Sequence, residues 1–199
     1  MTIWFTSDLH FNHDNIIRYC DRPFADVDEM NRALINNFNS VVDHNDMVVF
    51  VGDVCMGKIE SSIALVHHLN GFKILKPGNH DRCHSMFDNG SDKYKNYLEL
   101  YKNVFDDIIL DDVYLLEDFV ISHFPYPEGD GDYAGRDFSD YEPLDLGMPL
   151  LCGHVHELWQ TKVSKKGTWM YNVGVDVNNF TPVSLTDIQQ RYLQHCTGE

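Results

Sequence analysis

Groups of Asp, Asn and His residues follow five apolar runs of this sequence, and these are residue types that proteins use to bind metal ions. In chain order the groups are Asp8-x-His10, Gly52-Asp53, Gly78-Asn79-His80-Asp81, His123 and Gly153-His154-x-His156. In α/β sheets, ligands bind in the crevice beyond the carboxyl ends of the strands. Five strand ends that each carry metal-type ligands therefore predict one shared site.

The spacing within two of these groups favours joint binding of an ion. Residues two apart in an extended chain point the same way, so Asp8 is expected to share a face with His10, and His154 with His156. Each pair could hold one ion. A glycine begins three of the groups, where it would let the backbone turn sharply and come close to the metals or the substrate.

The apolar runs before these groups have the length and the β-branched or aromatic content of buried strands. They are Thr2 to Ser7, Met47 to Val51, Lys73 to Lys76, Phe119 to Ser122 and Leu150 to Cys152. Hydrophobic residues recur at helical spacing from Val27 to Val41, after Asp26, and again from Ile63 to Leu69. This alternation predicts βαβ units and a largely parallel sheet in the first half of the chain.

The second half has a different pattern. Residues Ile108 to Ser122 are expected to form consecutive strands, and Leu158 to Val163 and Thr168 to Val173 a hairpin. A last helix is expected from Thr186 to His195, because Thr186 and Gln189 have the spacing of a capping box.

The length, the composition and the cysteine pattern predict one globular domain located in the cytoplasm. With 199 residues the chain can bury roughly 70% of its unfolded surface, and no linker divides it, so residues 1–199 are expected to form a single domain. The charged Asp8 stands where the apolar core of a signal peptide would lie. No run approaches the length of about 18 apolar residues needed for a membrane span. The five scattered cysteines, never paired as C-x-x-C, are expected to be reduced.

The charge balance restricts the partners. There are 15 Lys and Arg against 31 Asp and Glu, a net charge of −16 with neutral histidines. Because duplex binding draws most of its energy from Lys and Arg on phosphates, we expect no binding to duplex nucleic acid and none to an anionic membrane. A small phosphate compound is compatible with this charge if a metal supplies positive charge locally. The sequence leaves the oligomeric state open.

One segment, Pro125 to Met148, interrupts the succession of strands and helices. It contains seven acidic residues, four glycines, three prolines and one basic residue, Arg136. It is either a solvated insertion or a functional loop. In the second case Tyr133, Phe138 and Tyr141 would stack on a base, and Arg136 would reach a phosphoryl oxygen.

The five groups, in this order, resemble the motifs of the calcineurin-like metallophosphoesterases over residues 8 to 156. The resemblance implies an α/β fold, a four-layer α-β-β-α sandwich with two packed mixed sheets and the metal site at the carboxyl ends of strands. It also implies two divalent ions held by seven residues: Asp8, His10 and His156 on one ion, Asn79, His123 and His154 on the other, and Asp53 between them. Ligands of these types suit Mn²⁺, with Fe²⁺ or Zn²⁺ as alternatives.

The same resemblance implies roles in catalysis. Two ions can share a water, lower its pKa toward about 7 and clamp the phosphoryl oxygens during in-line attack. His80, oriented by Asp81, would stabilise those oxygens or donate a proton to the leaving alkoxide. Asn79 and His80 would contact the substrate. His13, three residues past His10, lies either at the mouth of the substrate site or on the surface at the start of a helix.

We interpret the chain as a metal-dependent phosphodiesterase acting on a small phosphoester, with nucleotides and in particular cyclic nucleotides among the candidates. Protein Ser/Thr phosphatases of this superfamily carry arginines just after the second motif, whereas here Gly52-Asp53 continues as Val54 to Lys58. A phosphomonoesterase or a nucleotide pyrophosphohydrolase is the enzymatic alternative. A non-catalytic protein-binding scaffold on the same fold is the alternative from another class, which the presence of His80 and all seven expected ligands disfavours.

Overall fold

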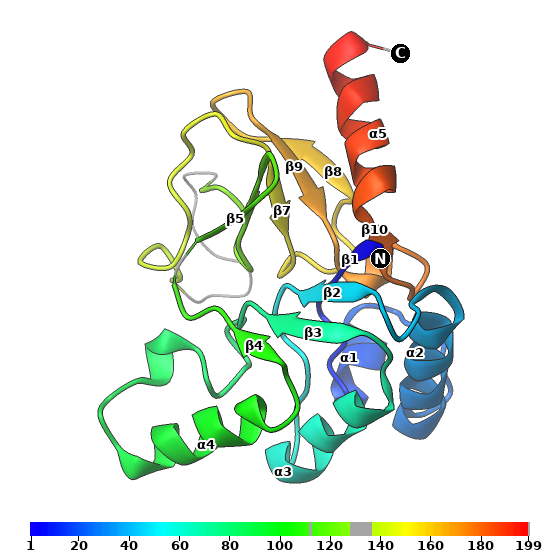
Figure 1. The fold of residues 1–199 in the computed structure, drawn as a ribbon, viewed down its shortest axis with the longest axis vertical. Helices are drawn as coiled ribbons and strands as arrows, with labels where there is room; N and C mark the ends of the chain where they lie inside the picture. Colours follow the sequence, from blue (N-terminus) through cyan, green and yellow to red (C-terminus); the bar gives the residue numbers. More distant parts are fainter. Residues whose placement is uncertain (112, 128–136, 199) are drawn as a thin grey trace.

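The computed structural model, which describes residues 1–111, 113–127 and 137–198, places the strands in two sheets (Figure 1). The strands are β1 Ile3–Thr6, β2 Met47–Phe50, β3 Phe72–Leu75, β4 Asp107–Ile108, β5 Tyr114–Leu116, β6 Phe119–Ile121, β7 Leu150–Cys152, β8 Thr161–Val163, β9 Trp169–Asn172 and β10 Val183–Ser184. The first sheet has the order β10-β1-β2-β3-β4 and the second the order β5-β6-β7-β9-β8. The predicted mixed α/β fold with two sheets is confirmed.

Strand directions follow the sequence pattern closely. Strands β1 to β4 run parallel and β10 pairs antiparallel with β1, so the parallel sheet expected in the first half is confirmed. In the second sheet β6, β7 and β9 run parallel, with antiparallel β5 and β8 at the edges. The consecutive strands expected after Ile108 are divided between the sheets, because β4 pairs with β3 while β5 and β6 form a hairpin.

The helices are α1 Asp14–Tyr19, α2 Val27–Val41, α3 Ile59–Ser62, α4 Asp92–Lys102 and α5 Leu185–Thr197, with 3₁₀ turns η1 Ile63–His68, η2 Ser85–Phe87 and η3 Val175–Val177. Helix α2 has the predicted bounds, and the Asp26 side chain caps it by accepting from the Glu29 amide. The helix expected after Ile63 is a 3₁₀ turn. Helix α5 is capped by Ser184 rather than by Thr186, since the Ser184 hydroxyl accepts from the Asp187 amide.

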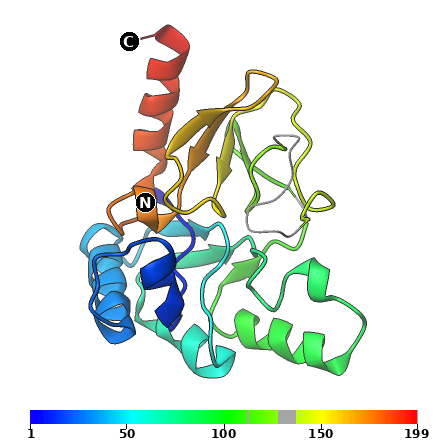
Figure 2. The same ribbon diagram turned by 180° about the vertical axis from the view of Figure 1, so that it is seen from behind.

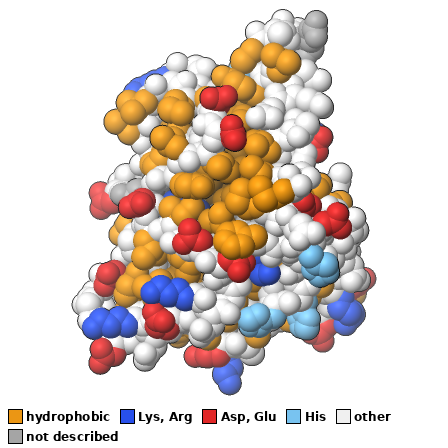
Figure 3. All heavy atoms as spheres, viewed as in Figure 1, with side chains coloured by type: hydrophobic (Ala, Val, Ile, Leu, Met, Phe, Trp, Pro, Cys, Tyr) orange, Lys and Arg blue, Asp and Glu red, His pale blue; other side chains and the backbone are white. Residues whose placement is uncertain are grey.

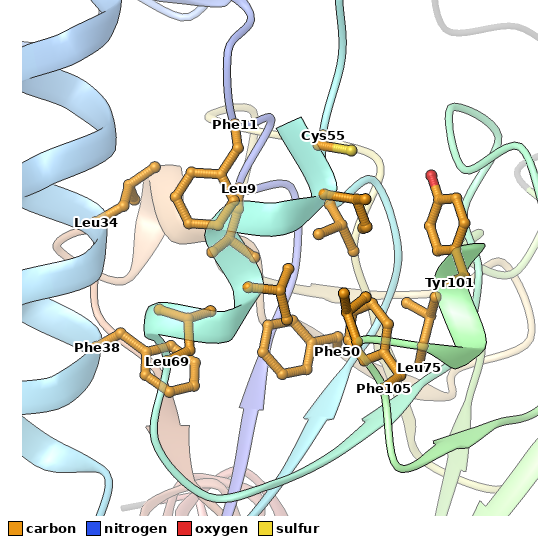
Figure 4. Packing of buried hydrophobic residues seen from close by; sticks show 14 of the residues in the cluster. Leu9, Phe11, Leu34, Phe38, Phe50, Cys55, Leu69, Leu75, Tyr101 and Phe105 are labelled. Carbon is orange, nitrogen blue, oxygen red and sulfur yellow. The ribbon is translucent and has the colours of Figure 1, made fainter. Parts of the chain in front are cut away.

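Helices pack on the outer face of the first sheet (Figures 1 and 2). Figure 4 shows Phe38 of α2 on one side of Phe50 of β2 and Phe105 on the other, while Leu34 of α2 lies beside Phe11. The Phe38 and Phe50 rings are stacked with centroids 5.7 Å apart. Full burial of such a side chain stabilises the fold by about 1.5–3 kcal/mol. Helix α2 is therefore fixed to the sheet by its apolar stripe, as its spacing predicts.

A second core lies between the sheets. Val49 alternates with Val48 and Phe50 along β2, so it points away from the helices and packs with Leu151 and Tyr171 of the second sheet. Ile188 of α5 joins the same cluster. Because β2 is buried on both faces, its sequence is a continuous apolar run rather than an alternating one.

The outer face of the second sheet is covered by loops in the described part of the chain. Val120, Leu150 and Met170 pack there against Tyr126 and Met148, which stand near the two ends of the segment 125–148. Figure 3 shows hydrophobic side chains gathered on the surface over the region where Figure 1 draws β5 and β7. None of the helices in the described ranges is both long and apolar enough to cross a bilayer.

Candidate metal centre

The carboxyl ends of strands from both sheets meet at one place. The Asp8 amide donates to the carbonyl of Gly52, at 3.0 Å, which joins the loops after β1 and β2. A parallel bridge between Ser7 and Gly174 links the end of β1 in the first sheet to the end of β9 in the second. Backbone contacts thus hold the loops after β1, β2 and β9 together, where the expected ligands Asp8, His10 and Asp53 lie.

The backbone of these loops is not extended. The prediction that Asp8 pairs with His10, and His154 with His156, because residues two apart in an extended chain point the same way, is therefore wrong in its reason. Asp8, His10, Asp53, His154 and His156 all have positive φ, between 47° and 70°. Non-glycine residues in this left-handed region cost of order 1–2 kcal/mol each and gather at functional sites. Asp8 and His10 do lie together, but left-handed backbone turns, and not an extended strand, direct their side chains to the same place.

Among the described residues, three overlapping groups each have their ligand atoms within 4.8 Å of one another, and one of them, formed by Cys20, His156 and Asp176, lies beside the expected ligands. The other two consist of expected ligands alone. The first of these two consists of Asp8, His10 and His156, and the second of Asp8, Asp53 and His123. Asp53 stands between them, with its Oδ2 3.6 Å from His10 Nε2 and 3.5 Å from His123 Nε2. This is the position that the resemblance implies for a bridging carboxylate.

A further group is centred on Asn79. Its Oδ1 lies 3.0 Å from His123 Nε2 and 2.9 Å from His154 Nδ1. The structure therefore brings all seven residues expected as ligands into one cluster, with Asn79 on the side of His123 and His154, and His10 on the side of His156.

One buried atom in this cluster tests whether a metal fits. His10 is 1% exposed, and its Nε2 has no hydrogen-bond partner in the described part of the chain. That nitrogen faces the carboxylates of Asp8, at 4.0 Å, and Asp53, at 3.6 Å. A buried polar atom without a partner costs about 1–3 kcal/mol, which a cation between the imidazole and the carboxylates would recover. The residues present fit a divalent ion.

The protonation of two of the four histidines in the cluster agrees with this fit. Burial lowers the pKa of His10 well below its usual value and that of His154 to about 3, so both rings are neutral and available as ligands. Burial would also lower the pKa of the other two, but the charge of Asp53 raises that of His123 to about 9 and the charge of Asp8 raises that of His156 to about 11, so a metal would have to displace a proton from each. Burial alone would raise the pKa of Asp53, but the charges of His123 and His80 hold it well below its usual range. Asp53 is thus a carboxylate at neutral pH.

Close packing explains two of the glycines. Gly52 has φ +91°, and a Cβ there would lie 2.5 Å from His123 Nδ1. A Cβ on Gly153 would collide with the side chains of Ser7 and Asp8. A side chain at either position would push apart the loops that carry the ligands.

His80 lies at the rim of the cluster. Its side chain is 28% exposed, its Nε2 is 4.0 Å from Asp53 Oδ2, and its ring centroid is 5.3 Å from that of His10. Its backbone amide donates to Asp53 Oδ1 at 2.8 Å. The imidazole therefore has one edge toward the ligands and another toward solvent.

Asp81 is expected to orient the His80 ring, but the contacts it makes are with other residues. Its carboxylate is fully buried and accepts hydrogen bonds from the amides of Gly78, Asp53 and Val54 and from the hydroxyl of Tyr101. Burial, and then the charge of Asp53, raise the pKa of Asp81 to about 7. Asp81 thus ties the loop after β3 to the loop after β2 and fixes the ligands those loops carry.

Two further residues at the site were not singled out from the sequence, Arg22 and Asp176. Asp176 Oδ2 lies 3.2 Å from His156 Nδ1 and accepts from Arg22 Nη2 at 2.9 Å, while Oδ1 accepts from Arg22 Nε at 2.7 Å. Arg22 also donates to the carbonyls of Asp8 and Leu9. A signal for Asp176 did exist, since it follows β9 as the other groups follow their strands, whereas Arg22 belongs to no motif.

A cavity of about 620 Å³ opens beside the cluster. Five of the cluster residues and His80 line it, together with His13, whose Nδ1 lies 3.2 Å from His10 Nδ1. Phe138 also lines it, whereas Tyr141 packs against His84 and Phe124. Tyr133 and Arg136 lie outside the described residues.

The chain belongs to the calcineurin-like phosphoesterase family, which it matches over residues 1–158. It is 32% identical to the Gene 66 protein of Mycobacterium phage L5 over 167 residues, which cover 77% of this chain and 76% of the relative. To the Gene 66 protein of Mycobacterium phage D29 it is 34% identical over 161 residues, with 77% and 78% covered.

Two further similarities extend the comparison. An uncharacterized protein of Methanocaldococcus jannaschii is 47% identical over 87 residues, 43% of this chain, and the match spans about half, 49%, of that relative's length. A crystal structure of a protein of unknown function from Aquifex aeolicus aligns with a TM-score of 0.66 at 23% identity, covering 95% of this chain and 98% of that one. That likeness shows a shared fold.

Proposed function

We propose that this protein is a metal-dependent phosphodiesterase that hydrolyses a small phosphodiester. The observation that carries the proposal is the buried, unpartnered Nε2 of His10 facing two carboxylates, at the junction of the groups that the family uses for metal binding. No Lys or Arg lines the described part of this cavity, so metal ions are the natural source of positive charge for a phosphate.

The ligands divide into two sets in this proposal. Asp8, His10 and His156 would hold one ion, Asn79, His123 and His154 the other, and Asp53 would contact both. The mixture of carboxylate, amide and imidazole suits Mn²⁺, with Fe²⁺ or Zn²⁺ as alternatives. When bound, two such ions lower the pKa of a shared water and offset the charge of the phosphoryl oxygens.

The chain's own side chains supply proton transfer and orientation. His80 stands at the rim, where its imidazole would reach both the phosphoryl group and the departing oxygen. A proton on that ring would go to the leaving alkoxide, a contribution of about 10²–10⁴-fold in rate. Asn79 would orient the phosphoryl group. His13 lines the cavity beside His10 and would contact the substrate at the mouth.

The charge of the cavity favours a diester over a monoester. No Lys or Arg is among the described lining residues, and Glu157 lies there. A phosphomonoester carries close to two negative charges at neutral pH, whereas a diester carries one. The second charge would meet a carboxylate and neither Lys nor Arg, so the diester is the better match.

Turnover of two chromogenic esters tests the proposal. Chelator-treated protein reconstituted with Mn²⁺ should hydrolyse bis(4-nitrophenyl) phosphate and act on 4-nitrophenyl phosphate at least about tenfold more slowly in kcat/KM. Preference for the monoester would instead support the phosphomonoesterase. Two metals bound per chain with no turnover of either ester, with Mn²⁺, Fe²⁺ or Zn²⁺, would refute catalysis and favour the scaffold. A screen of 2′,3′- and 3′,5′-cyclic nucleotides then identifies the physiological class.

A further inference from the structure

The cavity beside the metal centre has an apolar wall that the proposed chemistry does not use. Its polar floor consists of metal-type ligands, and its volume is in the range that holds a small organic ligand. The wall is made of large apolar side chains: Ile16, Tyr19, Met56, Phe138 and Leu158. A phosphoryl group on the floor would therefore have its ester group against this wall.

Tyr19, at the end of α1, is the most distinctive part of the wall. Its side chain is 69% exposed, and its ring meets the ring of His13 edge to face, with centroids 6.2 Å apart and an interplanar angle of 80°. The His13 ring in turn lies 5.2 Å from that of His10. This chain of rings runs from a metal-type ligand to an exposed aromatic face, and it holds that face at a fixed distance from the floor.

Leu158 and Phe138 extend the apolar wall. Leu158 is 60% exposed and follows the last of the metal-type groups by two residues. Phe138 packs edge to face on His154, with centroids 5.3 Å apart. Single exposed apolar residues are ordinary on protein surfaces, but here several line one cavity beside the ligands. An apolar group that covers this wall would remove it from water, and a flat ring could also stack on its aromatic side chains.

The charges along the cavity limit what that group can be. Glu157 is the charged side chain among the described lining residues outside the floor, and none of those residues is Lys or Arg. A second or third phosphate would lie against this carboxylate with no Lys or Arg among the described lining residues to offset its charge. The ester group that fits is therefore an uncharged ring, on a substrate that carries one phosphate.

We infer that Tyr19, Leu158 and Phe138 form a subsite for an uncharged ring on the ester group of a one-phosphate substrate. The inference rests on the proposed function, since the phosphoryl group must occupy the floor. Tyr19 supplies the face on which the ring stacks, and Leu158 supplies an apolar edge. An aryl ester and a nucleoside ester share this chemistry, and binding experiments separate them.

Matched, non-hydrolysable phosphonates measure the contribution of the ring. Calorimetry on the Mn²⁺-loaded protein should show phenylphosphonate binding about tenfold more tightly than methylphosphonate, the size expected for stacking of one ring. Tyr19→Ala should reduce this ratio to within about twofold, and Tyr19→Phe should keep it. Both variants should fold because Tyr19 is largely exposed. Leu193→Ala on α5, an equally exposed apolar position at 63%, should leave the ratio unchanged.

A second pair of ligands identifies the source of the ring. Adenosine 5′-monophosphate against ribose 5-phosphate isolates a base, and a preference that Tyr19→Ala abolishes in this pair alone assigns the subsite to nucleosides. A preference in the phenyl pair alone assigns it to aryl esters. Equal binding within both pairs, or a preference that Tyr19→Ala leaves intact, overturns the subsite. Turnover of bis(4-nitrophenyl) phosphate by the same preparation decides the proposed function separately, since turnover without ring preference removes only the subsite.

Discussion

Replacing Asp176 with Asn changes a side chain that holds a metal-type ligand without touching the cavity itself. The carboxylate accepts from Arg22 through both oxygens and lies 3.2 Å from His156 Nδ1. A metal that displaces the proton of His156 Nε2, which lies 3.9 Å from Asp8 Oδ1, would leave the proton on Nδ1 facing Asp176. Asp176 thus selects the tautomer that can bind a metal.

An amide cannot make the same contacts. If the Asn oxygen faces Arg22, its NH₂ group faces His156 Nδ1 and favours the tautomer with the proton on Nε2, which cannot be a ligand. If the amide is reversed, its donors face the guanidinium. Loss of such a supporting partner typically costs 10–100-fold in metal affinity, or about 1.4–2.8 kcal/mol.

Titration of Mn²⁺ into the chelator-treated protein measures this loss. We expect two binding events in the wild type and, in Asp176→Asn, one event weakened by about 10–100-fold with the other nearly unchanged. The exposed Asp43→Asn is the matched control, and thermal unfolding of the metal-free proteins reports any general damage. A folded variant with wild-type affinity at both sites would refute the role of Asp176.

Three other substitutions probe the site and its surroundings. Asp53→Asn should lower metal content and turnover together, because a neutral amide cannot offset two dications, and elemental analysis showing two metals with full turnover would contradict this. His80→Ala should keep both metals and lose about 10²–10⁴-fold in kcat on a diester with an alkoxide leaving group but little on a nitrophenyl diester; loss of a metal would make His80 a ligand instead. Asp145→Asn should lower the free energy of unfolding at pH 7 by about 1–3 kcal/mol, because the buried carboxylate accepts from the hydroxyls of Ser164, at 2.5 Å, and Thr168, at 2.7 Å. Burial would raise the pKa of Asp145, but these hydrogen bonds lower it, so the stabilisation is present above the unfolded pKa and is lost as pH falls through the folded one. The difference in unfolding free energy between the two proteins should begin to shrink below about pH 4, and a difference that stays constant with pH would contradict the assignment.

Much of the fold could be predicted from local patterns. Strand β7 and helix α2 have the predicted bounds, because an apolar run and an apolar stripe are properties of neighbouring residues. Helix α4 was missed, although Tyr94 and Tyr101 of its buried face are seven residues apart. The sequence of α4 is so polar that the helical period of its buried hydrophobic residues is not visible. The sheet to which β4 belongs could not be predicted from the sequence either, since a strand of two residues has no hydrophobic pattern of its own.

The sequence by itself determined which residue types stand at the strand ends, because a strand that enters a buried sheet must be apolar and the polar residues after it are plain to read. It did not determine how their side chains meet. That depends on left-handed turns at Asp8 and His156 and on the buried pair of Arg22 and Asp176, which are 154 residues apart in the chain. Only the tertiary structure decides such contacts, since the hydrogen bonds and packing that offset a strained turn or a buried charge come from segments distant in sequence.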